Sequence, residues 1–129
     1  MMLRYLLAPL TLALASSVLA APLPAPAHAE AEALLLGLEK SGCQFNRNGS
    51  WYSGAEARAH LQQKLDYLEG KGLIHSTEQF IEQGASNSSM SGKAYQVRCG
   101  TAAPLESRKW LEAQLGAQRL AARAASSPK

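Results

Sequence analysis

The stretch CQFNRNGSWY, from Cys43 to Tyr52, decides the fold of this chain of 129 residues. Its Asn48-Gly49 pair is the strongest short-range signal for a tight hairpin turn, because both central turn positions need a positive φ. Cys43 and Phe45 alternate with polar residues before the turn, and aromatic residues follow it. The stretch therefore predicts a two-stranded antiparallel hairpin.

The first residues of the chain predict export. Residues 1–4 carry one positive charge and no acid, and residues 5–20 are almost wholly apolar. This run is shorter than the roughly 20 residues of a membrane span, which is typical of a cleavable secretory signal. Small residues allow cleavage after Ala20 or Ala29, and we favour Ala29 because a regular helical pattern begins after it. An uncleaved membrane anchor is the alternative; after cleavage of residues 1–29 we expect no membrane insertion.

The chain has two cysteines, Cys43 and Cys99. In a small exported domain two cysteines most simply pair with each other. Residues 93–99 alternate, with Tyr95 and Val97 on the face of Cys99, and this pattern predicts a third strand. The expected disulfide would place this strand beside the first strand of the hairpin.

Helical spacing of apolar residues and helix caps predict the remaining elements. Capping boxes begin at Ser53 and Ser76, and Pro104 is expected in the first turn of the last helix. Helices are expected in four places, which are residues 30–41, about 54–69, the segment after Ser76 and the segment after Pro104. The order α-β-β-α-α-β-α gives one α+β domain over residues 30–115, with a small antiparallel sheet covered by helices. Residues 116–129 are expected to form a frayed or disordered tail.

Charge and ligand types limit the possible partners. The signal contains one of the 13 basic residues and none of the 10 acids, so the remaining chain is close to neutral. It has no basic run that would bind nucleic acid. The histidines lie far from both cysteines in sequence, so we expect no metal site and no cofactor.

The second helix carries a possible acid–base pair. Glu56, His60 and Lys64 follow one another at steps of four residues, so they lie on one line of the helix beside its apolar stripe. A carboxylate beside an imidazole can begin an acid–base pair near neutral pH. A helix-stabilising pair on a solvated face explains the same spacing.

Two further segments could contribute to a site. The polar loop over residues 86–92 contains serines that could supply a nucleophile or bind an anion, although it matches no known nucleophile or phosphate motif. We expect it to be too poor in large side chains to pack, and a flexible loop needs no function. Arg47 with Trp51 and Tyr52 could form a recognition patch, or the two aromatics could belong to the core.

Two long motifs resemble a known family. They are C-x-F-x-R-N-G-x-W-Y-x3-E-A-x2-H-L-x2-K, from Cys43 to Lys64, and A-S-x-S-S-x-S-G-K-x-Y, from Ala85 to Tyr95. This combination is similar to a family of short periplasmic proteins of Gram-negative bacteria that is classed as a domain of unknown function. The resemblance implies a periplasmic single domain, and it supplies no activity, substrate or catalytic residue.

We expect a periplasmic binding or interaction module rather than an enzyme, with an unidentified periplasmic protein or small ligand as its partner. The candidate binding residues come from the hairpin, the second helix and the serine loop, and are Arg47, Asn48, His60, Lys64, Ser88, Ser89 and Ser91. One alternative is a hydrolase that uses Ser89 or Ser91 with His60 as base and Glu56 to orient it. Another is a structural envelope protein without a discrete site.

Overall fold

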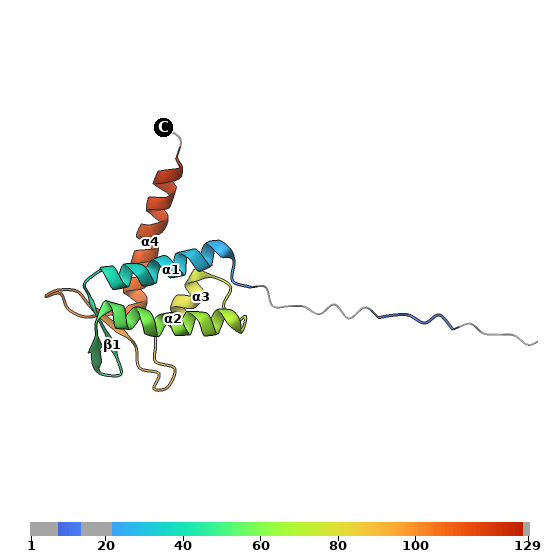
Figure 1. Ribbon diagram of the computed structural model, residues 1–129, viewed down its shortest axis with the longest axis horizontal. Coiled ribbons are helices and arrows are strands. Elements are labelled where there is room, and N and C mark those ends of the chain that lie inside the picture. Colours follow the sequence, from blue (N-terminus) through green and yellow to red (C-terminus); the bar gives the residue numbers. More distant parts are fainter. Residues whose placement is uncertain (1–7, 14–21, 128–129) are drawn as a thin grey trace, which may run out of the picture.

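The computed structural model describes residues 8–13 and 22–127 (Figure 1). Most of the predicted export signal therefore lies outside the described residues. The helices are α1 (Ala25–Lys40), α2 (Gly54–Gly70), α3 (Thr77–Gly84) and α4 (Ser107–Ser126). The strands are β1 (Gln44–Arg47), β2 (Ser50–Tyr52), β3 (Gln96–Arg98) and β4 (Leu105–Glu106). No helix in the described part of the chain is long and apolar enough to cross a membrane.

The strands form one antiparallel sheet in the order β2-β1-β3-β4. The turn at Asn48 and Gly49 has φ values of 54° and 87°, so the predicted hairpin is confirmed. The predicted disulfide is confirmed too: Cys43 precedes β1 and bonds to Cys99, which follows β3. Gln44 and Arg98 face each other next to this bond, so the disulfide closes one end of the pairing between β1 and β3.

The core lies between the helices and the inner face of the sheet. In Figure 1, α1 and α2 run side by side, with α3 and the start of α4 behind them. Both capping serines predicted for α2 and α3 accept hydrogen bonds from the first turn of their helices. The buried side chains of the helices and strands form one cluster that includes Leu34, Leu35, Leu38, Phe45, Leu61, Leu65, Phe80, Tyr95, Val97 and Leu111. The predicted α+β class is confirmed.

The first helix begins at Ala25 rather than at residue 30. Pro26 does not prevent this, because the first-turn N–H groups of a helix have no partner within the helix. Leu23 is buried in the core, the carbonyl of Ala27 accepts a hydrogen bond from Thr77, and Nδ1 of His28 lies 2.7 Å from Glu69 Oε2. The residues just before position 30 therefore belong to the folded domain.

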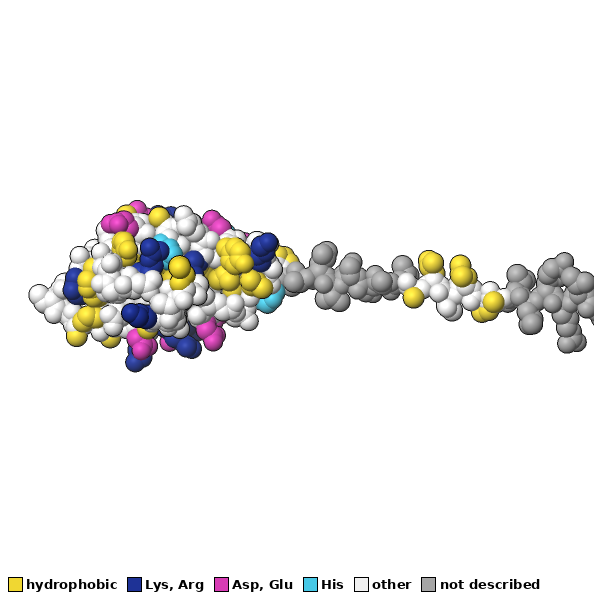
Figure 2. Space-filling view, turned by 90° about the horizontal axis from the view of Figure 1, so that it is seen from below, with side chains coloured by type: hydrophobic (Ala, Val, Ile, Leu, Met, Phe, Trp, Pro, Cys, Tyr) yellow, Lys and Arg dark blue, Asp and Glu magenta, His cyan; other side chains and the backbone are white. Residues whose placement is uncertain are grey.

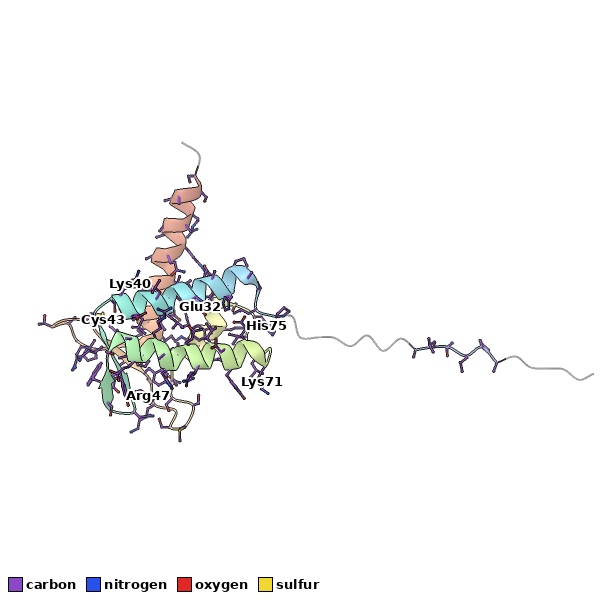
Figure 3. The ribbon with its side chains drawn as sticks, viewed as in Figure 1. Glu32, Lys40, Cys43, Arg47, Lys71 and His75 are labelled. Atoms are coloured by element: carbon purple, nitrogen blue, oxygen red, sulfur yellow. A yellow bond between two sulfur atoms is a disulfide. The ribbon has the colours of Figure 1, made fainter. Side chains whose placement is uncertain are left out.

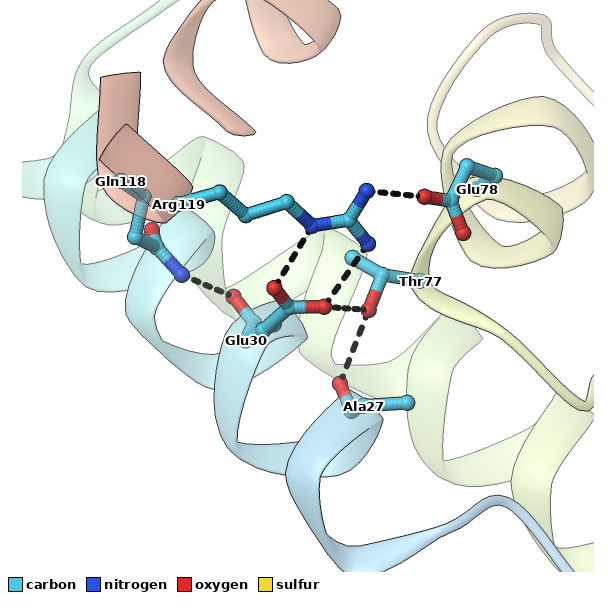
Figure 4. A network of polar contacts seen from close by, with 6 residues as sticks. All are labelled: Ala27, Glu30, Thr77, Glu78, Gln118 and Arg119. Carbon is cyan, nitrogen blue, oxygen red and sulfur yellow. Dashed lines mark hydrogen bonds and ion pairs between the residues drawn. The ribbon is translucent and has the colours of Figure 1, made fainter. Parts of the chain in front are cut away.

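The end of the chain also differs from the prediction. Pro104 does not start the last helix, because Leu105 and Glu106 first pair with β3 as the short strand β4. The expected frayed tail from residue 116 is wrong, since α4 remains helical to Ser126. Arg119 anchors the helix beyond residue 116, because its guanidinium binds Glu30 of α1 at 2.8 Å and Glu78 of α3 at 2.5 Å (Figure 4).

The disulfide is expected to supply a large share of the stability of this small domain. Its cysteines are 56 positions apart, and the chain-entropy model gives about 4 kcal/mol at most for a loop of such length. Replacing both cysteines (C43A with C99A) should lower the free energy of unfolding by up to this amount in urea titrations. The reduced natural chain is the matched control and should have the same free energy of unfolding as the double variant. If both are as stable as the oxidised natural chain, the prediction is contradicted.

Candidate functional site

The hairpin places Arg47 beside helix α2. Phe45 points into the core, and because side chains two residues apart share one face of a strand, Arg47 points the same way at the end of β1. Its guanidinium lies 5.2 Å from the ring centre of Tyr52 on the neighbouring strand, a cation–π contact. Figure 3 shows Arg47 at the hairpin, beside α2.

Helix α2 presents His60 and Lys64 toward the same point. The capping box between Ser53 and Glu56 fixes the start of the helix, because each residue binds a backbone N–H of the other. His60 and Lys64 follow at one and two turns from Glu56, and both side chains are half-buried.

A tyrosine hydroxyl connects the basic side chains. Arg47 Nη1 lies 2.6 Å from His60 Nδ1 and 3.2 Å from His60 Nε2, and Nε2 also lies 3.2 Å from the Tyr95 hydroxyl. Lys64 Nζ donates to the same hydroxyl at 3.2 Å and to the carbonyl of Asn87 at 3.1 Å. We refer to Arg47, His60, Lys64 and Tyr95 as the Tyr95 cluster.

The alternating pattern of residues 93–99 indicated that Tyr95 lies on the inner face of a strand, but not that its hydroxyl takes part in the site. The residue is 1% exposed, and its ring packs on Phe45 with 5.0 Å between ring centres. Its backbone is held by Ser86, which accepts from its N–H, and by Ser107, which donates to its carbonyl. A buried tyrosine usually directs its hydroxyl to a polar partner, and this general rule is the signal that could have identified it.

The Tyr95 cluster is strongly positive for its size. None of the ion pairs found among the described residues includes Arg47 or Lys64. Burial lowers the pKa of His60, and the charges of Arg47 and Lys64 lower it further. Burial and the charge of Arg47 lower the pKa of Lys64, while burial raises the pKa of the Tyr95 hydroxyl. The cluster is thus built from cations and a neutral donor, without a compensating carboxylate bound to it.

The serine loop is folded onto the hairpin, so the expectation that it does not pack is wrong. Ser88 is 6% exposed, and its hydroxyl accepts hydrogen bonds from Asn48 Nδ2 and from the N–H groups of Met90 and Ser91. The Ser91 hydroxyl in turn donates to Asn48 Oδ1 at 2.6 Å. Short polar side chains can pack here because each satisfies backbone groups of the loop or the hairpin turn.

A cavity of about 240 Å³ lies between these segments. It is lined by Arg47, Asn48, His60, Lys64, Ser88, Ser89, Met90 and Tyr95. A second cavity of about 160 Å³ on the other side of Arg47 and His60 is lined additionally by Phe45, Tyr52, Glu56 and Ala57. Figure 2 views this side of the molecule and shows basic side chains beside a histidine, with acidic side chains toward the margins.

The structure does not assemble the serine hydrolase arrangement. His60 binds Arg47 and Tyr95, whereas the Glu56 carboxylate accepts hydrogen bonds from Ser53. Ser89 lines the cavity without a hydrogen bond to His60, and Ser91 binds Asn48. His60, the expected base, and Glu56, the residue expected to orient it, therefore both have other partners.

Two other expectations concern aromatic residues and metals. The proposed patch of Arg47 with both hairpin aromatics is divided, because Trp51 stacks under Arg98 at 3.9 Å while Tyr52 contacts Arg47. Within residues 8–13 and 22–127, no three His, Cys, Asp or Glu side chains group closely enough to hold a metal ion.

Ser88 provides a test of the loop. S88A should lower the free energy of unfolding by about 1 to 3 kcal/mol, because the side-chain amide of Asn48 and the N–H groups of Met90 and Ser91 all lose their acceptor. S89A is the matched control: Ser89 is exposed, so its loss should change stability by no more than about 0.5 kcal/mol. Thermal or urea unfolding of both variants measures the difference, and equal stability would show that Ser88 does not organise the loop.

Comparisons with known proteins identify the family of this chain. A model described as "Family of unknown function (DUF5329)" matches residues 25–119. The chain is also 40% identical over 57 residues to the "Uncharacterized protein YfeK" of Salmonella typhimurium, a match that covers 44% of this chain and 46% of that protein. No solved structure matches the chain. The family resemblance stated from the two motifs is therefore confirmed, and the chain belongs to the DUF5329 family of unknown function.

Proposed function

We propose that this protein is a binding module that takes up an anionic group at the Tyr95 cluster. The observation that carries the proposal is the meeting of Arg47, His60 and Lys64 around one tyrosine hydroxyl beside a cavity of about 240 Å³. Basic side chains that are brought together without an acid repel each other, and an anion between them would relieve this repulsion.

The donors in the cavity suit an oxyanion. Arg47 uses Nη1 for His60, and the remaining N–H groups of its guanidinium can bind two oxygens of a carboxylate, phosphate or sulfate. Lys64 adds a compact charge, and Asn48 and Ser88 add neutral polar groups at the wall. The size of the cavity favours a small ligand, or one acidic group of a larger partner, over an extended polymer.

The presence of a cavity lined by these groups favours binding over a structural envelope role without a discrete site. It also favours binding over hydrolysis, because the histidine at its wall is bound to an arginine and a tyrosine. A general base needs a free nitrogen within hydrogen-bond reach of the proton it accepts.

We also propose that the protein is exported to the periplasm and cleaved after Ala20 rather than Ala29. The signal pattern of residues 1–20 supports export, and the disulfide suits an oxidising compartment. Cleavage after Ala29 would remove Leu23 from the core and His28 from its contact with Glu69. Cleavage after Ala20 leaves the whole of α1 intact.

Anion binding can be measured by calorimetric titration with inorganic sulfate and inorganic phosphate. R47Q and K64Q should each weaken binding by about tenfold or more, because a hydrogen bond to a charged group contributes roughly 1.5 to 3 kcal/mol. R123Q and K71Q are matched controls: Arg123 lies on α4 and Lys71 directly after α2, both outside the cavity lining, and both variants should leave binding unchanged. If R47Q and K64Q bind these anions as tightly as the natural chain does, the proposal is overturned.

The processing site can be tested by sequencing the N-terminus of protein isolated from the periplasmic fraction. We expect it to begin at Ala21. Purified chains that begin at Ala21 and at Glu30 provide a second measurement, and the shorter chain should unfold at a lower temperature because it lacks Leu23 and His28. A mature N-terminus at Glu30, or equal unfolding temperatures, would contradict cleavage after Ala20.

A further inference from the structure

We propose that the Tyr95 cluster takes up a proton on His60 together with its anion, so that affinity for the anion rises as pH falls. This inference rests on the proposed anion site and adds its regulation. It follows from the contacts that Arg47 and Tyr95 make with the two nitrogens of one imidazole ring.

The contact with Arg47 fixes the protonation state of His60. A guanidinium has only N–H donors, so the nitrogen it contacts must offer a lone pair. Arg47 Nη1 lies 2.6 Å from Nδ1 and 3.2 Å from Nε2, so the much shorter contact assigns the lone pair to Nδ1. His60 is therefore neutral in this arrangement, with its proton on Nε2, which donates to the Tyr95 hydroxyl at 3.2 Å.

The Tyr95 hydroxyl has no room for another donor. Its oxygen accepts from His60 and from Lys64, which uses both lone pairs. No side chain among the described residues accepts the hydroxyl hydrogen of Tyr95, so this hydrogen can be donated to an anion in the cavity it lines. The hydroxyl thus stays a neutral link between His60 and Lys64.

A second proton on His60 must then bind Nδ1, the nitrogen that accepts from Arg47. The proton comes from solvent, the bond between Arg47 Nη1–H and Nδ1 breaks, and both N–H groups become free to donate. Without an anion this change places a third positive charge beside Arg47 and Lys64 and is unfavourable. An oxyanion in the cavity can accept from both released donors, so the proton and the anion stabilise each other.

The surroundings of His60 support this coupling. The charged and titratable groups that face it are Arg47 on β1, Tyr52 on β2, Glu56 and Lys64 on α2, and Tyr95 before β3. The carboxylate of Glu56 already accepts hydrogen bonds from Ser53. The dominant charged neighbours of His60 are therefore cations. Burial and these cations lower the pKa of His60 in the empty site, and a bound anion must raise it.

The sign of the pH dependence follows from this shift. A ligand that raises the pKa of a group binds more tightly when that group is protonated. Affinity should therefore increase as pH falls through the range between the pKa of His60 with the anion bound and its lower pKa in the empty site. The increase can reach about tenfold per pH unit for one proton.

Sulfate is the decisive probe, because its double negative charge does not change near neutral pH. Titration calorimetry of the natural chain at about pH 7.5 and about pH 5.5 should show tighter binding at the lower pH. Repeating the titration in two buffers of different ionisation enthalpy should show uptake of about one proton per sulfate. H60Q should bind sulfate with the same affinity at both pH values, and H75Q, in the segment between α2 and α3 and outside the cavity lining (Figure 3), should retain the pH dependence.

The outcomes separate this inference from the proposed function. Sulfate binding that is independent of pH and takes up no proton would overturn the coupling and leave the anion site in place. The same pH dependence in H60Q as in the natural chain would also overturn it. Absence of sulfate binding at both pH values would overturn both proposals. As an independent measurement, NMR titration of the His60 ring should show a higher pKa in R47Q than in the natural chain, and an unchanged or lower pKa would contradict the competition for Nδ1.

Discussion

The bond between Cys43 and Cys99 joins two strands that are 56 positions apart in the sequence. It lies at one end of the pairing between β1 and β3, and the remaining register follows from it: Phe45 faces Val97 and Asn46 faces Gln96. The hairpin is also attached by the pairing of β1 with β3 and by the hydrogen bonds of Asn48 with Ser88 and Ser91. The disulfide adds a covalent constraint to these attachments and so helps to fix the hairpin relative to the segment before β3, with the cavity between them.

The candidate site consists of side chains from three segments that are placed by different means. The hairpin supplies Arg47 and Asn48 through a tight turn with positive φ at both central positions. Helix α2 supplies His60 and Lys64, whose spacing of one turn is fixed by the capped helix. The segment from the serine loop to β3 supplies Tyr95, which is anchored by its buried ring. The polar ends of these side chains meet because their backbones are held by local bonds and by the core.

Local signals in the sequence predicted most of the fold. The hairpin, the capped helices and the disulfide each depend on residues close together in the chain or on a unique pair, so their chemistry is readable from sequence. Strand β4 was missed because two residues carry no periodicity, and its existence depends on pairing with Gln96 and Val97. The anchoring of α4 beyond residue 116 was missed because it depends on Arg119 reaching two other helices.

The candidate residues were predicted better than their arrangement. Arg47, His60 and Lys64 were identified from residue type and spacing, and they do meet. The sequence could not show that His60 turns toward Arg47 and Tyr95 rather than toward Glu56, because helical spacing permits either contact. The order in the serine loop was also hidden, since it depends on Asn48 at the tip of a hairpin 40 positions away from Ser88.

Helix α4 extends beyond its last anchor at Arg119, and every side chain over residues 120–127 is exposed. Figure 1 shows this end rising on the side of α1 opposite to the hairpin and the serine loop. A fluorophore, affinity handle or immobilisation linker attached after Ser126 would therefore stand clear of the cavity. The protein can be fixed to a sensor surface by its carboxyl end with the binding face turned to solution.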